Sequence, residues 1–558
     1  MTENKSASRR EGPMGQRGIA LIGVVGLLLV FLIFAGAMLD QLAYELNSTK
    51  MSAVSNRSLA AADAGIRAMT EQIQTNLALN AGLPTPMAYS YPEPGASPAV
   101  VSYKASILKQ WPAGSLNYYL IESTGTFQNG ILSSVTRTVR AIVKSQPIAD
   151  YASFSNYETN QFGNQVWYLS TQHFNGPVYS GGPMNIAYAT PAPSPGPTVE
   201  PIFLSTVQTV NSPVWNPGMP GSTSDWLSVI SGGQSAFTQS ATGLSLPQSS
   251  SNVAVASEAW EGDSTNTFSS GYPAVAAGVY IDGASSGGLN AATTTDTTDN
   301  TGIFINTASS SATIVATASG NTETMKITSP AWSGTYVVNI NYTDFEGSGN
   351  CNGTTSVTYG SATHVFSGTP CGEPGVGVTN PGAGAIFATG NINLGNAGTP
   401  NTTIEGSYTM AVPDYEEWTN GGATINIADN LTYYDSGSQL YDDLGLWANN
   451  VVLTGKNTSN VQIDAAIIAG WPGEPSNDGT FNNANCTKTT CGTLDQGTLT
   501  VLGSLVENAR GAVGEVVSGS QFGFSRIIDF DSRFATSPPP YNPTTGQLEI
   551  VAWEDLGQ

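Results

Sequence analysis

Positive charge is scarce in this chain of 558 residues. Lys and Arg together number 18 against 41 Asp and Glu, so the net charge is −23. A chain this acidic repels the phosphate backbone of nucleic acids and the anionic surface of lipid bilayers. We therefore predict no nucleic acid partner.

Charged residues of both signs are few. They make up 11% of the chain, whereas hydrophobic residues make up 40%. Because a chain of this length buries a large share of its surface, its core is ample, and its exposed surface must consist mainly of Ser, Thr, Asn and Gly. Such a surface is typical of many secreted bacterial β-proteins. We expect the bulk of the chain to lie outside the cytoplasm.

Side chains suited to catalysis are also rare. Histidine occurs only at His173 and His364, and neither lies in a nucleophile-elbow, zinc-protease or triad motif. Glycoside hydrolysis needs a pair of carboxylates, and nearby pairs are Asp414 with Glu416, Asp442 with Asp443, and Asp529 with Asp531. Because such pairs are common in any acidic chain, we predict no enzyme and no catalytic residue. A β-helix carbohydrate-active enzyme is the less favoured alternative.

Cysteine occurs four times, as Cys351, Cys371, Cys486 and Cys491. An even number in a Ser/Thr/Asn-rich chain predicts disulfides formed after export, Cys351 with Cys371 and Cys486 with Cys491. The competing interpretation is a four-thiolate zinc site, which usually has two-residue spacing inside each pair. The run at 293–302 offers oxygen ligands but lacks the Gly and Glu positions of an EF-hand loop. We predict no metal and no cofactor.

The longest uncharged run lies near the N-terminus. Ile19 to Leu39 is 21 apolar or small residues, and about 20 are needed for a helix to cross the hydrocarbon core. Basic residues outnumber acidic ones before it, which predicts a cytoplasmic N-terminus; they are Lys5, Arg9, Arg10 and Arg17 against Glu3 and Glu11. We predict a transmembrane helix at 19–39. A plain uncleaved anchor and a cleaved signal peptide are the alternatives.

Helical periodicity continues beyond this run. Apolar residues recur mostly at steps of three and four, at Leu42, Leu46, Met51, Val54, Leu59, Ala62, Ile66, Met69, Ile73 and Leu77. The pattern stops at the helix-ending residues Gly82, Pro84 and Pro86. We predict one helix from Ile19 to Leu79, with an extramembrane extension at 40–82.

Three glycines lie within the predicted span, Gly23, Gly26 and Gly36. Small residues let two helices approach each other closely in a membrane. We therefore predict that these glycines are packing sites for partner helices.

From Pro84 onward the helical pattern gives way to short alternating or β-branched runs. Examples are "NYYLIESTGTF", "TYVVNINYTDF" and "ATINIADNLTYY", which Gly, Asn and Asp turns separate. The chain is thus predicted to be α+β, with a long N-terminal helix and a mainly β extracellular region. We expect a small β-rich module at 84–160, packed on the helix, and a large β-rich domain at 161–558.

The sequence pattern of the large domain favours a parallel β-helix. Stretches such as "AGVYIDGASSGGLN" and "AIFATGNINLG" are short strands that end in Gly turns, as expected where each rung turns a corner and stacks on the next. Because the intervals are irregular, a β-sandwich is the alternative. Insertions rich in Pro, Gly or Ser are predicted at 191–201 and 284–302.

Two stretches of the helical region carry a family resemblance. "RGIALIGVVGLLLVFLIF" resembles the N-terminal segment of type IV prepilins, in which a short basic leader ends in Gly. "SLAAADAGIRAMTEQI" is similar to a stretch of PilX-type minor pilins and of the large pseudopilins of type II secretion, with Asp63 where those usually have Glu. The resemblance implies that a prepilin peptidase removes the leader at 1–18 by cutting between Gly18 and Ile19.

One position departs from the family pattern. Major pilins carry Glu at the fifth mature position, where its carboxylate pairs with the amino group of a neighbouring subunit, and here that position is Gly23. A buried ammonium without a partner is costly. The resemblance therefore implies a rare, priming or tip-located subunit rather than a major one.

Two later stretches add to the resemblance. "GPVYSGGPMNI" and "GFSRIIDFDSRFATSPPPYNP" resemble elements of PilX-like and DUF4900-type proteins. We predict a minor pilin-like structural and assembly component of a type IV pilus or type II secretion pseudopilus, which displays an acidic β-rich head. The alternative is a membrane-anchored surface adhesin or glycan-binding protein.

The resemblance also implies partners and a location. The expected partners are other pilins or pseudopilins, contacted through the N-terminal helix, together with prepilin peptidase and the inner membrane. A glycan or other surface ligand of the head is left open. We expect a single pass through the inner membrane, with the bulk of the chain in the periplasm or outside the cell.

Overall fold

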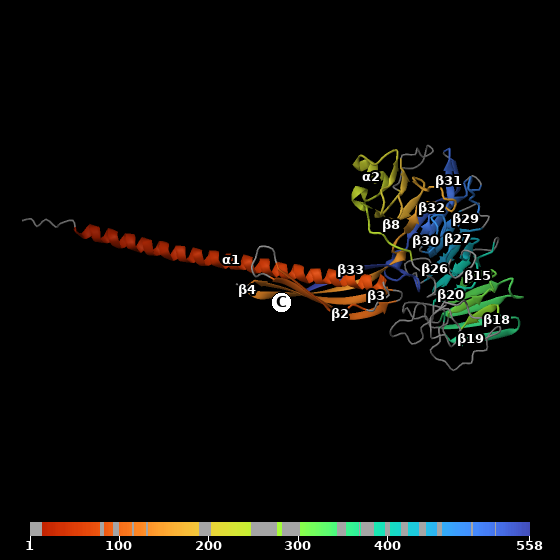
Figure 1. Ribbon diagram of the computed structural model, residues 1–558, viewed down its shortest axis with the longest axis horizontal. Helices are drawn as coiled ribbons and strands as arrows, with labels where there is room; N and C mark the ends of the chain where they lie inside the picture. The colour runs from red at the N-terminus through yellow and green to blue at the C-terminus, as the bar shows by residue number, and fades with distance from the viewer. Residues whose placement is uncertain are drawn as a thin grey trace, which may run out of the picture. The chain divides into compact units, whose positions relative to one another are not determined.

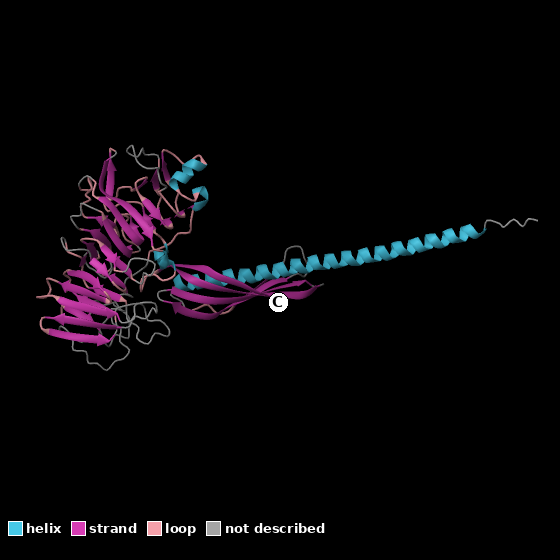
Figure 2. Cartoon of the chain, turned by 180° about the vertical axis from the view of Figure 1, so that it is seen from behind, coloured by secondary structure: helices cyan, strands magenta, loops and turns pink. Residues whose placement is uncertain are grey.

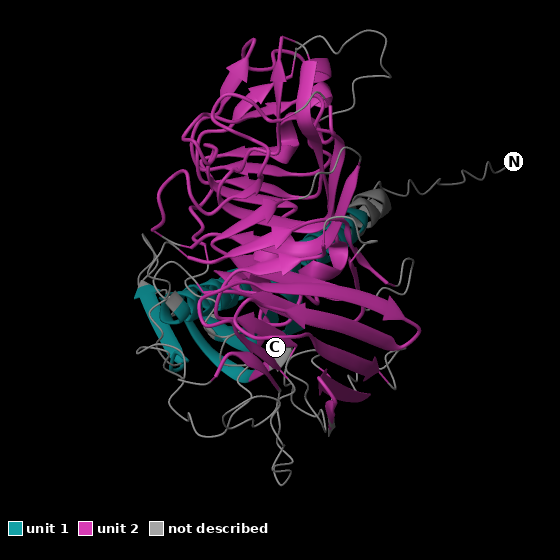
Figure 3. Cartoon of the chain, turned by 90° about the vertical axis from the view of Figure 1, so that its right-hand side faces the viewer, with its two compact units in different colours: residues 1–109, 119–143, 550–558 teal, residues 110–118, 144–549 magenta. Residues whose placement is uncertain are grey.

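The computed structural model describes residues 14–78, 83–92, 100–113, 116–129, 132–188, 202–246, 276–281, 302–342, 353–367, 369, 384–396, 402–413, 422–434, 442–454, 460–471, 473–492, 495–518 and 520–557. The chain divides into two compact units (Figure 3). The first comprises Met1–Lys109, Tyr119–Val143 and Ile550–Gln558, and the second comprises Gln110–Tyr118 and Lys144–Glu549. Each unit has its own hydrophobic core.

The first unit is built on one long helix. α1 spans Met14–Ala78 and has 65 residues, and Figures 1 and 2 show it as a single unbroken helix. The sequence of α1 contains no proline, so every residue after the first turn keeps the N–H that an α-helix needs. The predicted continuous helix is confirmed.

A five-stranded sheet accompanies α1. Its strands are β1 (Met87–Pro92), β2 (Val100–Ala113), β3 (Leu116–Asn129), β4 (Leu132–Pro147) and β33 (Thr544–Gly557), in the order β1-β2-β3-β4-β33. β1 pairs antiparallel with β2, so that Tyr89 lies opposite Tyr103. The C-terminal strand β33 lies beside β4 in this sheet, although the sequence predicts a large domain that runs to residue 558.

α1 packs closely on this sheet through one stripe of its C-terminal half. The buried side chains of the stripe are Val54, Ser58, Ala61, Ala62, Ile66, Met69 and Ile73. A Cβ added at Gly125 of β3 would lie 2.0 Å from the Ser58 carbonyl oxygen and 2.4 Å from the Ala62 backbone nitrogen. The Ser58 hydroxyl donates to the Val135 carbonyl at 2.8 Å. The absence of a side chain at Gly125 thus lets helix and sheet meet backbone to backbone.

The described residues of the second unit form three sheets. The largest has 16 strands, which are β5 (Ser153–Tyr157), β7 (His173–Asn175), β8 (Val178–Ser180), β10 (Val207–Thr209), β12 (Phe237–Gln239), β13 (Gly278–Ile281), β14 (Ile303–Asn306), β20 (Ala385–Ala388), β22 (Thr402–Ile404), β23 (Ser407–Ala411), β25 (Leu431–Tyr433), β26 (Asp443–Ala448), β28 (Val461–Ala469), β30 (Gly497–Ala509), β31 (Gly514–Val517) and β32 (Ser520–Phe530).

The other two sheets have nine and three strands. The nine-stranded sheet contains β15 (Ala312–Ser319), β16 (Thr322–Thr328), β17 (Tyr336–Tyr342), β18 (Gly353–Tyr359), β19 (Ala362–Ser367), β21 (Ile392–Leu394), β24 (Thr424–Ile427), β27 (Asn450–Leu453) and β29 (Phe481–Asn483). The three-stranded sheet contains β6 (Trp167–Leu169), β9 (Asn185–Ala187) and β11 (Val214–Asn216).

Short helices complete the unit. They are α2 (Thr223–Val229) and the 3-10 turns η1 (Ile148–Asp150), η2 (Gly233–Ala236) and η3 (Ser532–Ala535). α2 begins with a capping box, in which the Ser222 hydroxyl accepts from the Asp225 backbone and the Asp225 carboxylate accepts from the Ser222 backbone.

Most strands of the second unit pair in parallel with a strand that lies a short distance away in the sequence. In the 16-stranded sheet β20 pairs with β23, β23 with β26, β26 with β28 and β28 with β30. In the nine-stranded sheet β21, β24, β27 and β29 stack in the same way. Parallel rungs are what a β-helix requires, whereas a β-sandwich pairs antiparallel strands. The α+β class is confirmed, and the β-helix stays a prediction that these registers favour.

The stacking order differs from the chain order. β5 pairs with β30 on one side and with β8 on the other, so the chain enters the 16-stranded sheet in its middle. From there β8, β10 and β12 stack in one direction. The later strands start at β13 and return toward β5 through β30.

Alternating residues of the 16-stranded sheet face two different cores. On β14, Ile303 and Ile305 belong to the main core and Phe304 to a second cluster. The second cluster is rich in aromatic rings, which include Tyr151, Phe154, Tyr179, Tyr280, Phe387, Trp447 and Trp471. Both faces of this sheet are therefore buried, as the continuous apolar runs of its strands require.

Candidate functional site

The N-terminal half of α1 presents an apolar surface up to Leu39, after which polar and apolar side chains are interspersed. Every side chain described between Leu21 and Met51 is exposed. The helix is long enough and apolar enough to cross a membrane. Exposed apolar surface costs about 25 cal/mol per Å² in water, so this half of α1 needs lipid or protein around it.

The three glycines predicted as packing sites lie in this exposed half. A Cβ added at Gly23, Gly26 or Gly36 would meet no atom within 4 Å. Within the chain nothing therefore requires glycine there, although each glycine costs a helix about 1 kcal/mol relative to Ala. Packing against a partner helix stays a prediction.

The predicted cleavage site lies at the start of the same helix. Gly18 and Ile19 both belong to α1, and residues 1–13 lie outside the described residues. Cleavage between Gly18 and Ile19 stays a prediction.

The C-terminal half of α1 is clamped to β33. The Trp553 indole nitrogen donates to the Asp63 carboxylate at 3.0 Å. Arg137 of β4 donates to the Ser55 hydroxyl at 2.9 Å and also pairs with Asp555. The hydrogen bond from Arg137 to the Asp555 carboxylate lowers the pKa of Asp555. No local sequence pattern indicates these contacts, which join residues as far as 490 positions apart.

The predicted cysteine pairs have different outcomes. Cys486 and Cys491 form a disulfide, as predicted. Cys351 and Cys371 lie outside the described residues. No group of His, Cys, Asp and Glu side chains within the described part of the chain has the arrangement of a metal site.

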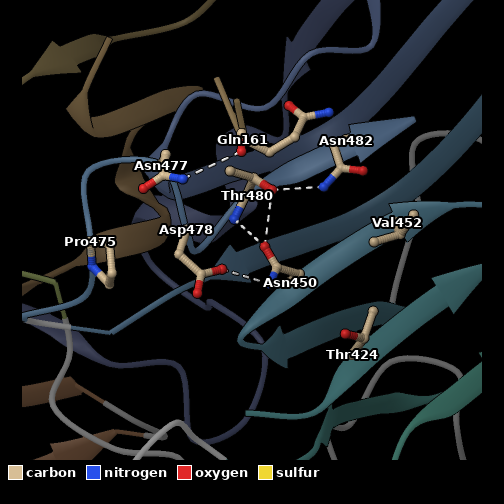
Figure 4. A pocket seen from close by; sticks show the side chains of 9 residues that line it. All are labelled: Gln161, Thr424, Asn450, Val452, Pro475, Asn477, Asp478, Thr480 and Asn482. Carbon is tan, nitrogen blue, oxygen red and sulfur yellow. Dashed lines mark hydrogen bonds between the residues drawn. The ribbon is translucent and has the colours of Figure 1, made fainter. Parts of the chain in front are cut away.

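An open polar groove lies on the second unit (Figure 4). It has a volume of about 430 Å³, and residues of β24, β27 and β29 line it together with residues of the two loops around 161 and 475–478. The full lining is Gln161, Thr424, Asn450, Val452, Pro475, Asn477, Asp478, Thr480 and Asn482. Asp478 is the only ionisable residue among them.

Hydrogen bonds fix the side chains of the groove. The Asn450 amide donates to the Asp478 Oδ1 at 2.9 Å and accepts from the Thr480 N–H at 2.8 Å. The Asn482 amide donates to the Thr480 hydroxyl at 2.7 Å. Within the described residues no hydrogen bond uses the Asn482 Oδ1 or the Asp478 Oδ2. The groove therefore offers preset polar groups with little charge.

The carboxylate pairs named from the sequence are not all exposed. Asp442 and Asp443 are buried, and burial raises the pKa of Asp443 to about 7. Asp529 lies on β32 and Asp531 directly follows that strand. The remaining pair, Asp414 with Glu416, lies outside the described residues.

Charged side chains are instead buried beside the junction of β5 and β30. The Arg526 guanidinium pairs with the Glu507 carboxylate at 3.2 Å, and both are almost fully buried. The other Glu507 oxygen accepts from the backbone N–H groups of Phe481 and Gly511 at 2.9 and 2.8 Å. Burial raises the pKa of Glu507, and the Arg526 charge opposes this.

A second buried pair lies nearby. The Glu158 carboxylate accepts from the hydroxyls of Ser155 and Ser180, each at 2.7 Å, and lies 3.7 Å from the Arg510 guanidinium. That guanidinium lies over the Tyr168 ring at 3.6 Å from its centroid. Because these groups are fully packed, we assign them a structural role.

The chain was compared with known proteins at three levels. Protein-family models, curated proteins and solved structures gave no match.

Proposed function

We propose that this chain is a membrane-anchored, prepilin-like subunit, a minor component of a type IV pilus or a type II secretion pseudopilus. One observation carries the proposal. A single helix, α1, presents a wholly exposed apolar half and continues without a break into a half that packs under a sheet. A subunit that inserts by its helix and displays a folded head needs both halves.

The exposed glycines of α1 favour assembly with partner helices over the alternative of a simple membrane anchor. Gly23, Gly26 and Gly36 have open space beside them, and a simple anchor gains nothing from glycine in a helix. Gly23 also lacks the carboxylate that shaft subunits of the resembling family carry, so the proposed role is priming or tip-located.

The second unit is the displayed head in this proposal. We interpret its stacked parallel strands as a parallel β-helix in the periplasm or outside the cell. In its interior the buried carboxylates of Glu507 and Glu158 each face an arginine, Arg526 and Arg510, which suits a rigid structural part.

The test is the N-terminal sequence of the protein purified from membranes of its native host. The proposal predicts a chain that starts at Ile19. Replacement of Gly18 by Arg is expected to leave the leader in place, whereas the matched control Gly23→Ala is processed normally. A wild-type chain that starts at Met1 or Thr2 is only anchored, and one that starts at Met38 carried a secretion signal; either result contradicts the proposal.

The groove favours a second candidate function, the binding of a neutral glycan. Its fixed amides and hydroxyls suit a ligand rich in hydroxyl groups, and the scarcity of charge in it contrasts with the net charge of −23 of the whole chain. Gel electrophoresis in the presence of soluble neutral polysaccharides tests this function. Glycan binding is supported if a polysaccharide retards the wild type and the control variant Asn339→Lys, on β17, but not the groove variant Asn482→Lys. Equal mobility of the wild type with and without every polysaccharide argues against it.

A further inference from the structure

The two edges of the five-stranded sheet are built differently. β1 has six residues and ends in Pro92, whereas β33 has 14 residues and contains no proline. β33 is the last strand of the sheet, and no strand of the described chain pairs with its outer side. A strand in this position presents a row of unpaired N–H and C=O groups.

The side chains of β33 add to this difference. Ile550, Val551 and Trp553 are each 48% exposed and Leu556 is 40% exposed, and β33 contains no Lys or Arg. Natural sheets protect their edges with short strands, proline or lysine. β1 has the first two of these protections and β33 has none.

The exposed edge is also held in place. The Trp553–Asp63 hydrogen bond and the Arg137–Asp555 ion pair fix β33 beside α1 and β4. A fixed strand loses little entropy when a second strand joins it, which favours binding. The edge is therefore suited to pairing and is not a loose chain end.

We propose that the outer edge of β33, residues 548–556, binds an extended segment of a different polypeptide, which adds to the sheet as a sixth strand. Backbone hydrogen bonds supply the affinity in such an addition, and alternate side chains supply the specificity. Glu549 pairs with Lys144 and Asp555 pairs with Arg137, so Glu554 is the acidic group left for the partner. The segment is apolar at alternate positions and carries Lys or Arg opposite Glu554.

A second copy of this chain fits the edge less well. β33 runs along α1 in the opposite direction, since Trp553 bonds Asp63 while Asp555 connects through Arg137 to Ser55. Antiparallel pairing of two β33 edges would point the two α1 helices in opposite directions, which excludes a common membrane orientation. Parallel pairing in register would place Glu554 beside its own copy, and like charges opposite each other destabilise a strand pair.

The inference goes beyond the proposed function, because it requires neither cleavage at Gly18 nor a filament. The experiment uses the full-length protein in membranes of its native host, with the photo-crosslinking residue p-benzoylphenylalanine introduced in separate variants at Ile550, Ala552 and Leu556, so that Glu554 stays in place. Tyr89 on the β1 edge is the matched control position. Adducts are mapped to single residues by mass spectrometry.

The expected result is one partner segment in which the crosslinked residue moves by two for each step of two along β33, as the strand period requires. Adding Ala552→Lys is expected to lower the adduct yield at Leu556 about tenfold, or about 1.4 kcal/mol, while Ser90→Lys on β1 does not. Thermal unfolding confirms that both variants fold. Adducts without the two-residue period, adducts only with lipid or with a second copy, or equal yields at Tyr89 overturn the proposal.

Discussion

The two units break the usual rule of apolar inside and charged outside in opposite ways. The first exposes apolar side chains, from Leu21 to Met51 on α1 and at the edge of β33. The second buries charged ones, among them Glu507 and Arg526. Exposed apolar surface marks where another molecule is expected, whereas buried charge marks where the fold depends on its own electrostatics. Substitutions in the two units are therefore expected to fail in different ways.

The largest effect is expected from breaking a buried ion pair in the second unit. Arg526→Met leaves the Glu507 carboxylate buried without its charge partner, and such a change costs about 4 kcal/mol. Urea denaturation measures the loss. Adding Glu507→Gln to this variant is expected to restore most of the stability, because the unpaired charge is then gone while the amide oxygen still accepts from the Phe481 and Gly511 N–H groups. If Arg526→Met leaves the free energy of unfolding unchanged, the second unit does not depend on this buried ion pair, and the contrast between the two units fails.

The next effect separates the two halves of α1. Ile66 is buried, so Ile66→Ala is expected to destabilise the first unit by about 3 kcal/mol. Leu32 is exposed, and Leu32→Ala is expected to change stability by less than about 0.5 kcal/mol. Hydrogen exchange of β2 to β4 measures both variants in detergent. Equal losses would show that the exposed half also has a partner within the chain.

Glycine substitutions sharpen the same contrast. A Cβ at Gly125 meets backbone atoms of α1, so Gly125→Ala is expected to cost about 2 kcal/mol. At Gly26 there is open space, and Gly26→Ala is expected to leave the folded unit intact while it weakens assembly with partner helices. Thermal unfolding and co-purification are the two measurements. A stable Gly125→Ala protein would contradict the close packing of helix and sheet.

Dependence on pH is expected to come from the second unit. The pKa of Asp443 is about 7 in the folded chain against an ordinary value of 3.8. Between these values the folded state keeps a proton that the unfolded state has lost, so stability falls as pH rises through this window. Asp443→Asn removes this loss, so the melting temperature of the variant is expected to rise relative to that of the wild type between about pH 4 and about pH 7. A constant difference across that range would contradict the assignment.

The smallest effect concerns the clamp on β33. Asp63→Ala removes the acceptor of the Trp553 indole and is expected to cost about 1 kcal/mol. Trp553→Phe removes the donor. Because either single change already breaks the hydrogen bond, the double variant is expected to lose less free energy of unfolding than the sum of the two single losses. Denaturation of all three variants gives the coupling, and additive losses would show that the bond contributes nothing.

Local patterns made the helix and its two halves predictable. The unbroken apolar run and the later spacing of Val54, Ala62, Ile66 and Ile73 specify which half faces outward and which half packs. The Cys486–Cys491 disulfide was predictable for the same reason, because its residues are neighbours in sequence.

Contacts between distant residues were not predictable. Nothing in the sequence near β4 indicates that β33 pairs with it, and the Asp63–Trp553 bond joins two residues that each look ordinary in their own segments. The groove was not predicted because Asn450, Thr480 and Gln161 become neighbours only when strands and loops distant in sequence come together. Single-sequence patterns report period and turns, and they do not report which strands become neighbours.

The entry of the chain into the middle of its largest sheet has a consequence for biogenesis. The Ser504 hydroxyl donates to the Tyr151 carbonyl across 353 residues, so β5 cannot form its native contacts until β30 has been synthesised. At about 5–20 residues per second, that wait lasts about 20 to 70 s. During it the edge of β5 is open to wrong pairing. The order of stacking thus makes the nascent second unit a natural client for holdase chaperones.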